Sequence, residues 1–196
     1  ANFGFITPDT LIATGKGRNL GLELTFEHFL NKGFYFLYTA SLFDSKYQGS
    51  DEVWRNSAFN GNYVTNLLIG KEWNLGKKQG KGSRFTLSAD LKTTLAGGQR
   101  YTPSDVVADP SSPGNFKQEY DYNKAFTKQF SDYSRTDIKL AFRINGKKIT
   151  QEWAIDAQNI FDQQNIYSEK FNKATGEKSF TYQTGRLIIP QYRIIF

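Results

Sequence analysis

The sequence predicts an all-β fold of about seven long antiparallel strands, and two patterns support this prediction. Apolar and polar side chains alternate over stretches of roughly 10–15 residues, longer than the five or six residues usual in globular sheets. The connections are also alternately short (31–33, 77–82, 145–146) and long (47–60, 98–132, 162–186). Short turns at one end and long loops at the other are typical of an antiparallel transmembrane β-barrel wall, in which alternate residues face lipid.

The expected strands are 19–30, 33–46, 61–76, 83–97, 134–144, 147–161 and 187–196. In the first strand, Leu20, Leu22 and Phe26 occupy even positions and polar side chains occupy odd ones. The second strand also places its apolar side chains at even positions, so its connection to the first holds an odd number of residues. A three-residue turn with Gly33 in the left-handed conformation fits this requirement and pairs Leu30 with Phe34.

The middle strands alternate in the same way. In 61–76, Leu67, Ile69 and Trp73 face one side, and a short basic turn at 77–82 leads to the next strand. The stretch 83–97 is the most regular, with leucines opposed to charged residues such as Asp90 and Lys92. The insertion 98–132 contains three prolines and is expected to be an irregular loop, either functional or disordered.

The strands 134–144 and 147–161 meet at Asn145-Gly146, the strongest hairpin signal in the chain. A two-residue turn here places Ile144 opposite Lys147 and fixes the register of the hairpin. In that register Lys139 lies opposite Glu152, and Arg135 lies opposite Asp156. The sequence therefore predicts two structural ion pairs on the polar face, with Arg193 nearby.

The last strand, 187–196, ends on an aromatic residue, and Tyr192, Ile194 and Phe196 share one face. The closing strand of an outer-membrane barrel is expected to end this way, so these three residues are the candidate assembly signal. The same stretch would also suit the final strand of a soluble sheet. The seventh strand ends on the short-turn side. Because the number of strands is odd, the first strand begins on the opposite side, among the long loops. Because bacterial barrels normally have an even number of strands, we expect earlier strands to be missing from this sequence.

Composition narrows the classes of function. The 196 residues include no Cys and a single His, which argues against disulfides, thiol chemistry and a metal site at His28. The net charge is +6, but Lys and Arg are spread over strands and turns, so no nucleic-acid partner is expected. No apolar run approaches the roughly 20 residues of a transmembrane helix. Glu152 and Asp156 share a face but have basic neighbours, so an ion-pair role is expected and an enzymatic one is not.

Seven segments carry a resemblance to a known family: Ala13–Thr25, Ser41–Tyr47, Arg55-Asn56, Asn62–Glu72, Ala96–Pro103, Asp156–Asp162 and Ile189–Phe196. Through them the chain resembles the C-terminal portion of a TonB-dependent outer-membrane receptor of the kind found in Bacteroidetes. The resemblance covers nearly the whole chain, and its motifs are barrel and loop positions rather than a chemical signature. It implies a 22-strand barrel around a plug, with residues 1–196 supplying the C-terminal part of the wall. The plug, the TonB-contacting segment and the earlier strands are absent from this sequence.

The resemblance implies uptake across the bacterial outer membrane of a scarce ligand, namely an iron chelate, a vitamin, a glycan or a peptide. It also implies these partners: outer-membrane lipid, the remaining strands and plug of the receptor, the TonB complex, a surface lipoprotein and the outer-membrane assembly machinery. No cofactor is expected. Ligand contact is expected in the long loops, where aromatic rings and cationic donors occur together: Tyr47, Trp54, Arg55, Arg100, Tyr101, Tyr120 and Tyr122.

Two other functions remain open at this point. The chain could be a soluble ligand-binding β-sheet or small barrel, or an outer-membrane barrel subunit or client that the assembly machinery recognises through the C-terminal strand. Which face of the sheet is exposed distinguishes the soluble ligand-binding protein from the receptor. In a receptor the lipid-facing set is Leu87, Leu91, Leu140, Ile155 and Ile194. The matching lumen-facing set is Asp90, Lys92, Lys139, Asp156 and Arg193. In a soluble protein the apolar faces would instead converge on a dry core.

Overall fold

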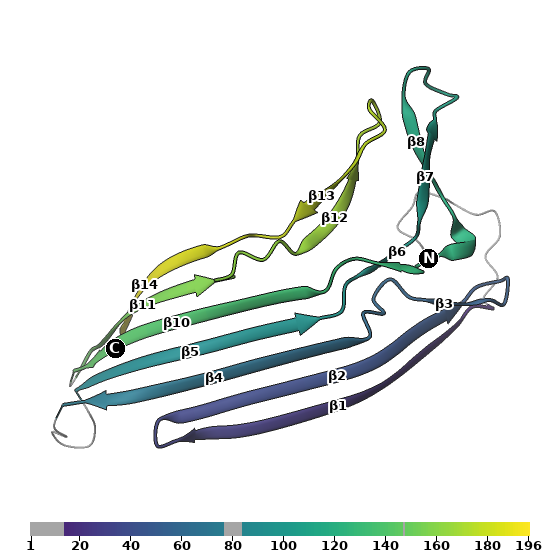
Figure 1. Ribbon diagram of the computed structural model, residues 1–196. Helices are drawn as coiled ribbons and strands as arrows, with labels where there is room; N and C mark the ends of the chain where they lie inside the picture. The colour runs from purple at the N-terminus through teal and green to yellow at the C-terminus, as the bar shows by residue number, and fades with distance from the viewer. Residues whose placement is uncertain (1–13, 77–83, 147) are drawn as a thin grey trace.

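The computed structural model describes residues 14–76, 84–146 and 148–196, and one antiparallel sheet dominates it (Figure 1). The long strands of this sheet are β1 (Lys16–Asn31), β2 (Phe34–Gln48), β4 (Tyr63–Leu75), β5 (Phe85–Ala96), β10 (Tyr133–Asn145), β11 (Thr150–Gln158) and β14 (Leu187–Ile195). They pair in sequence order, and the short strand β3 (Trp54–Asn56) pairs with the end of β2. The predicted all-β class, the seven strands and their order are confirmed. The sheet is not a closed barrel, since β1 and β14 each pair on one side only within the described residues.

The backbone register aligns the alternating apolar and polar side chains of each strand with those of its neighbours across the whole sheet. One row of directly opposed residues runs Phe36, Ile69, Leu91, Ile138, Ala157, Ile188. The adjacent row, on the other face, runs Glu27, Leu37, Leu68, Lys92, Asp137. Opposed residues point to the same side of a sheet, so one face is largely apolar and the other largely polar. The two sets of residues predicted for opposite faces do lie on opposite faces.

The two faces differ in exposure. On the apolar face large side chains remain exposed, as with Leu22 at 71% and Ile188 at 62%. The polar face holds the most buried residues of the sheet, including Thr86, Ala141 and Glu152. In a single-layer sheet the inner side of a bend crowds its side chains. We infer that this sheet curves toward its polar face.

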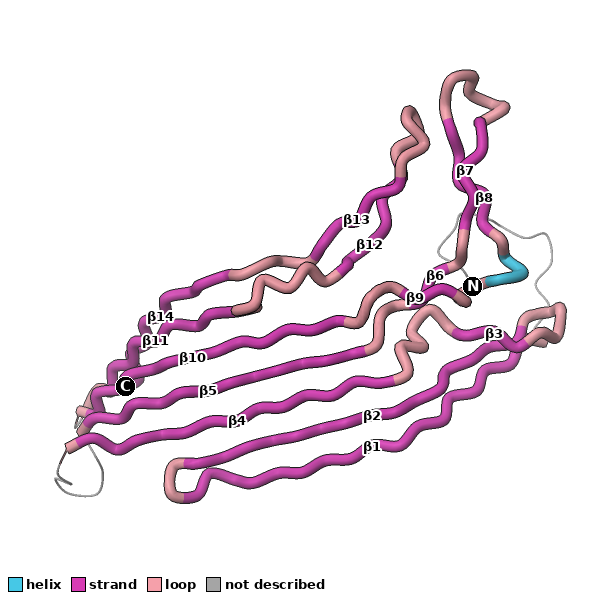
Figure 2. The backbone as a smooth tube through the Cα atoms, viewed as in Figure 1, coloured by secondary structure: helices cyan, strands magenta, loops and turns pink. Residues whose placement is uncertain are grey.

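Short turns lie at one end of the sheet and long loops at the other (Figure 2). The turn predicted at 77–82 lies outside the described residues. The long loops contain the short strands β6 (Arg100–Tyr101), β7 (Ser104–Ala108), β8 (Phe116–Tyr120), β9 (Lys128–Gln129), β12 (Ile166–Phe171) and β13 (Lys178–Tyr182), with a 3-10 turn η1 (Tyr122–Lys124). The expectation of an irregular 98–132 loop was therefore wrong, because this segment pairs with itself as β6–β9 and β7–β8. No helix in the described part of the chain is long and apolar enough to cross a membrane.

The β1–β2 turn differs in detail from its prediction. Gly33 is left-handed as predicted (φ 76°), but Lys32 is left-handed too (φ 50°), and Asn31 rather than Leu30 pairs with Phe34. These two positive φ angles form a two-residue hairpin turn. A register shift between His28 and Asn31 supplies the extra residue that the alternation requires.

The predicted two-residue turn at Asn145-Gly146 is wrong. A type I′ turn needs positive φ at both residues, and neither has it. Instead β10 continues alongside β5, with the Asn145 amide donating to the Arg84 carbonyl, and Asn145 pairs with Thr150. The position predicted for Lys147 lies outside the described residues. The pairing moves by an even number of residues, so every side chain keeps its predicted face.

The two predicted ion pairs depended on that turn and are therefore also wrong. Lys139 lies opposite Asp156 rather than Glu152, and Arg143 takes the place opposite Glu152. Glu152 Oε2 accepts from Arg143 Nη2 at 2.8 Å, and Arg193 lies 4.0 Å from Glu152 Oε1, as the expected proximity of Arg193 requires. Arg135 pairs with Asp137 on its own strand at 2.7 Å. Glu152, only 5% exposed, is therefore held between two guanidinium groups on neighbouring strands.

A second cross-strand contact on the polar face depends on a glycine. The Tyr35 ring lies over Gly70, and its hydroxyl donates to Asp90 Oδ1 on the strand beyond, at 2.5 Å. A Cβ at position 70 would lie 2.1 Å from Tyr35 Cζ. Gly70 thus lets one tyrosine span three strands.

We predict that Gly70→Ala lowers the free energy of unfolding by roughly 1–3 kcal/mol, because the added methyl group displaces the Tyr35 ring. Thermal unfolding measures the change. Gly17→Ala, where an added Cβ meets nothing within 4 Å, is the matched control. Because the two residues touch, Gly70→Ala and Tyr35→Ala should be less than additive when combined, and strict additivity would contradict the contact.

Candidate functional site

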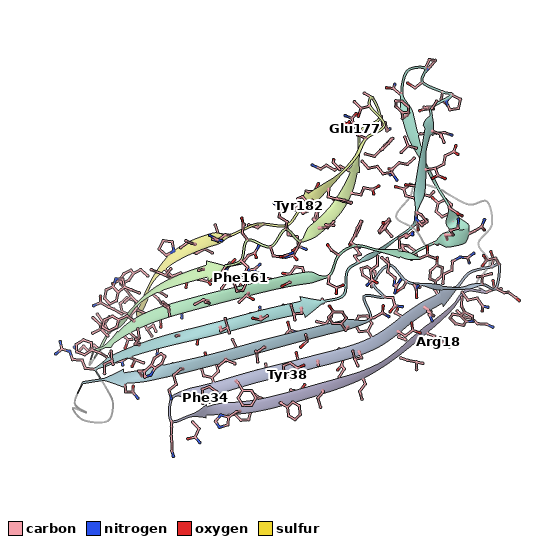
Figure 3. The ribbon with its side chains drawn as sticks, viewed as in Figure 1. Arg18, Phe34, Tyr38, Phe161, Glu177 and Tyr182 are labelled. Atoms are coloured by element: carbon pink, nitrogen blue, oxygen red, sulfur yellow. The ribbon has the colours of Figure 1, made fainter. Side chains whose placement is uncertain are left out.

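The long-loop end of the sheet holds the candidate functional residues. Two hairpins, β7–β8 and β12–β13, rise from this end of the sheet (Figure 1), and Figure 3 shows Tyr182 and Glu177 on the second of them. They come from different loops, 98–132 and 162–186. Binding residues are often carried by loops that a rigid scaffold positions, so the internal contacts of these loops decide what they can bind.

The seven loop residues predicted to contact a ligand do not form one site. Tyr47 and Arg55 are register partners across β2 and β3, and the Tyr47 ring meets Phe126 edge-on at 6.2 Å. Trp54, also on β3, lies under the Arg18 guanidinium. Tyr101 stacks on Phe130 with ring centroids 4.4 Å apart. Tyr120 and Tyr122 lie next to each other near η1, with ring centroids 6.2 Å apart.

Arg100 has a structural role instead of an open cationic group. Its Nε donates to the Asn60 carbonyl at 2.7 Å, and its Nη2 donates to Asn62 Oδ1 at 2.8 Å. These bonds join the insertion 98–132 to the loop before β4. Two N–H groups already have protein acceptors, so Arg100 is a poor candidate for ligand contact.

Asn60 organises this loop junction and is fully buried. Its Oδ1 accepts from the Ser45 amide at 3.0 Å, and its Nδ2 donates to Asp44 at 3.1 Å and to Asn56 at 2.9 Å. A buried asparagine with both polar atoms satisfied fixes the chain around it. The 47–60 loop is therefore held in place at its base.

Asn165 has a similar role at the base of the other loop. Its Oδ1 accepts from the Ser134 amide at 2.9 Å, and its Nδ2 donates to the Ser134 carbonyl at 2.8 Å. The side chain thus makes the two bonds that a neighbouring strand would make to the end of β10. Asn159, 1% exposed, closes the same loop through Gln163 and Thr184.

The two projecting hairpins are joined to each other. The Phe116 amide donates to the Lys173 carbonyl at 2.7 Å, Gln118 Nε2 donates to Glu169 Oε1 at 2.8 Å, and Lys178 Nζ donates to the Ser104 carbonyl at 2.7 Å. Phe130 below them packs edge-on against Phe180 at 5.8 Å. The two loops therefore act as one structural unit.

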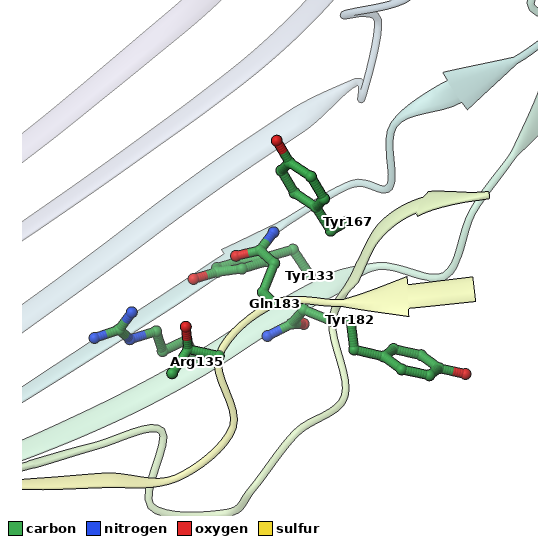
Figure 4. A pocket seen from close by; sticks show the side chains of 7 residues that line it. Tyr133, Arg135, Tyr167, Tyr182 and Gln183 are labelled. Carbon is green, nitrogen blue, oxygen red and sulfur yellow. The ribbon is translucent and has the colours of Figure 1, made fainter. Parts of the chain in front are cut away.

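A hollow of about 420 Å³ lies where the β12–β13 hairpin meets the end of β10. It is lined by Tyr133, Arg135, Asn165, Tyr167, Tyr182, Gln183 and Thr184 (Figure 4). Arg135 belongs to the polar face of the sheet and is fixed there by Asp137 and by Gln158, whose Oε1 accepts from Nη2 at 2.9 Å. In Figure 4 the phenol of Tyr182 extends away from Arg135, at the opposite end of the group. The hollow offers phenol rings for stacking and amide groups for hydrogen bonds.

Most residues of this hollow were not among the sequence-based candidates. Only Arg135 was named, and as an ion-pair residue. Tyr133, Tyr167 and Tyr182 flank strand ends and are separated by up to 49 residues (182 − 133). The one local signal was the pattern Asn165-Ile166-Tyr167, which places a polar and an aromatic residue at a strand entrance.

Comparison with family models, with curated proteins and with solved structures finds no match. Among the described residues no three His, Asp or Glu side chains gather as a metal site would require. The rings, amides and single guanidinium of the hollow suit noncovalent binding of a polar ligand.

We predict that Asn60→Ala weakens the loop junction by roughly 1–3 kcal/mol, because the Ser45 amide and its neighbours lose a buried partner. Hydrogen exchange of residues 44–62 should accelerate. Asn19→Ala is the control, since the exposed Asn19 accepts a single bond from Ser45 Oγ. Equal protection in both variants would contradict the role of Asn60.

A second prediction concerns Asp51 and pH. The Arg55 guanidinium, 2.6 Å away, lowers the pKa of the Asp51 carboxyl below its ordinary value, with help from the Val53 amide. The pair is present above the ordinary pKa of Asp and is lost as the pH falls through the lowered value. In Arg55→Gln the Asp51 pKa should rise, as followed by the carboxyl carbon shift in NMR. Arg55→Lys, which keeps the charge, should raise it less, and an unchanged pKa in Arg55→Gln would refute the assignment.

Proposed function

We propose that this chain forms part of the wall of a transmembrane β-barrel in the bacterial outer membrane, within a TonB-dependent receptor that takes up a scarce ligand. The chain itself is not an enzyme in this proposal. The polar face lines the lumen, the apolar face meets lipid, and the hairpins of the long loops face the outside of the cell. The remaining strands, the plug and the contact with TonB belong to parts of the receptor beyond this sequence.

The exposed apolar face carries the proposal. Seven strands present a largely apolar surface, and no second layer covers it within the described residues. The buried apolar residues of the described chain are three alanines, Ala125, Ala141 and Ala154. The dry leucine core that a soluble protein needs is not formed by the described strands. A hydrocarbon environment would make this exposure favourable.

The strand dimensions support the same proposal. The apolar side of β5 extends from Phe85 to Leu95, which is roughly 34 Å at about 3.4 Å per residue. A tilt of about 45° reduces this to roughly 24 Å, close to the apolar band of about 25 Å in outer-membrane barrels. The curvature toward the polar face is the curvature that a barrel wall requires.

The two open edges support the presence of further strands. β1 and β14 are long and leave one row of backbone groups unpaired by any described residue. Such edges invite pairing with other strands, and barrel closure removes them. In the proposed receptor the missing strands of a 22-strand barrel complete both edges. The terminal strand β14 with Tyr192, Ile194 and the 93% exposed Phe196 would serve as the signal for the assembly machinery.

The hollow at Tyr133, Arg135 and Tyr167 gives this receptor a contact surface for its ligand. It opens on the polar face at the long-loop end, where an incoming ligand would enter the lumen. This assignment moves the ligand contact from the seven loop residues to the base of the β12–β13 hairpin. The iron chelate, vitamin, glycan or peptide that the receptor would take up must present polar groups there.

We predict that Leu91→Arg impairs assembly in the outer membrane by roughly 2–4 kcal/mol if Leu91 lies at mid-bilayer, because a cation then faces hydrocarbon. Heat-modifiable migration of the outer-membrane fraction measures assembly. Leu37→Arg is the matched control, since Leu37 lies in the adjacent row but on the polar face, opposed to Glu27. Normal assembly of Leu91→Arg, or equal damage from both variants, would favour a soluble sheet instead.

A further inference from the structure

We propose that Lys16, Arg18 and Lys46 form a binding site for the phosphorylated headgroup of a membrane lipid. The site lies on the lipid-facing side of β1 and β2, at their long-loop end. The inference rests on the proposed function, because it requires that the apolar face meets a bilayer.

The register places the three cations together on one face. Arg18 lies directly opposite Lys46, and Lys16 lies two residues along the same strand, opposite Gln48. The next pairs on this face are Leu20 with Asp44 and Leu22 with Leu42. The pairing between Lys16 and His28 has no register shift, so the cations share the face of the exposed leucines. Figure 3 shows Arg18 at the long-loop end of β1, whereas Phe34 lies near the short turn.

The site has an excess of positive charge. Arg18 Nη2 and Lys46 Nζ lie 3.5 Å and 3.2 Å from the same oxygen, Oδ2 of Asp44. The other oxygen of Asp44 accepts from the buried Asn60. Among the described residues Lys16 has no ion-pair partner. One carboxylate thus neutralises part of the charge of two of the three cations, and a phosphate group would balance the charge that remains.

The neighbourhood suits a lipid rather than a free anion. Leu20, Leu22 and Leu42 are all more than half exposed and lie immediately below the cations on the same face. A headgroup at the cations would lay its acyl chains along these leucines. The Trp54 ring, 5.4 Å from Arg18 Cζ, is placed where an amphipathic ring would lie at a membrane interface.

The cluster is confined to this part of the sheet. On the same face, the long-loop ends of the other strands carry uncharged residues: Tyr63 on β4, Leu95 on β5, Ser134 on β10 and Ile188 on β14. A general attraction to an anionic surface would not require this restriction. One local headgroup site on β1 and β2 accounts for it.

The test compares lipid retention by the complete receptor of which this chain is proposed to form part of the wall, as the wild type and as Arg18→Gln/Lys46→Gln. Each is reconstituted in phosphatidylcholine nanodiscs containing phosphatidic acid, released into mild detergent, and examined by native mass spectrometry for retained lipid. We expect the wild type to retain phosphatidic acid preferentially and the double variant to bind it roughly 10–30-fold more weakly. Lys170→Gln/Lys173→Gln, which removes the same charge from exposed positions near the tip of the β12–β13 hairpin, should bind like the wild type.

A gain-of-binding variant separates the site from a structural role. Asp44→Asn removes the competing carboxylate and should strengthen retention of phosphatidic acid. Equal retention by the wild type and the double variant, with normal heat-modifiable migration of both, would overturn the lipid site and leave the barrel proposal standing. Failure of the wild type to enter bilayers would overturn both proposals. Equal loss in the hairpin control would show a nonspecific charge effect and also overturn the site.

Discussion

The two-residue period of an extended chain is the constraint on which the rest of this structure depends. Once the backbone ladders from β1 through to β14 are set, they decide which side chains lie on the apolar face and which on the polar face, and which residues lie opposite each other. Glu152 lies between Arg143 and Arg193, and Tyr35 reaches Asp90 across Gly70, because the register aligns those positions. The register also places the cations Arg18 and Lys46 opposite each other, next to Leu20 on the same face. Side-chain chemistry here follows from a backbone regularity.

The same constraint explains what the sequence could predict. Strand positions and faces follow from alternation, which needs no knowledge of distant residues, and these were confirmed. The predicted partner of Lys139 was wrong because it depended on a two-residue turn at Asn145-Gly146. That turn is decided by the residue just before β5, because the Arg84 carbonyl accepts from the Asn145 amide and extends the pairing with β10, and no local dipeptide reports this bond. The predicted pairing was displaced by an even number of residues, so Glu152 kept its predicted face and lost only its predicted partner Lys139.

The candidate site was less predictable because it is built from contacts between distant segments. Asn60 and Asn165 look like ordinary loop asparagines in the sequence, yet each is buried and holds the base of a loop. The hollow combines Tyr133 at a strand start with Tyr182 at the end of a hairpin. Aromatic content correctly indicated that the loops hold rings. It could not indicate whether a ring, as in Tyr101 on Phe130, is already stacked on another.

The backbone bond between Phe116 and Lys173 has a consequence for how such a surface can vary. It joins the tips of two loops that are encoded far apart, and it does so through main-chain atoms, which tolerate any side chain but no change in reach. The side chains at positions 116 and 173 are therefore free to change as far as this bond is concerned, while an insertion or deletion in one hairpin must be matched by the other. Diversification of the two hairpins would then proceed by substitution within a fixed pair of loop lengths.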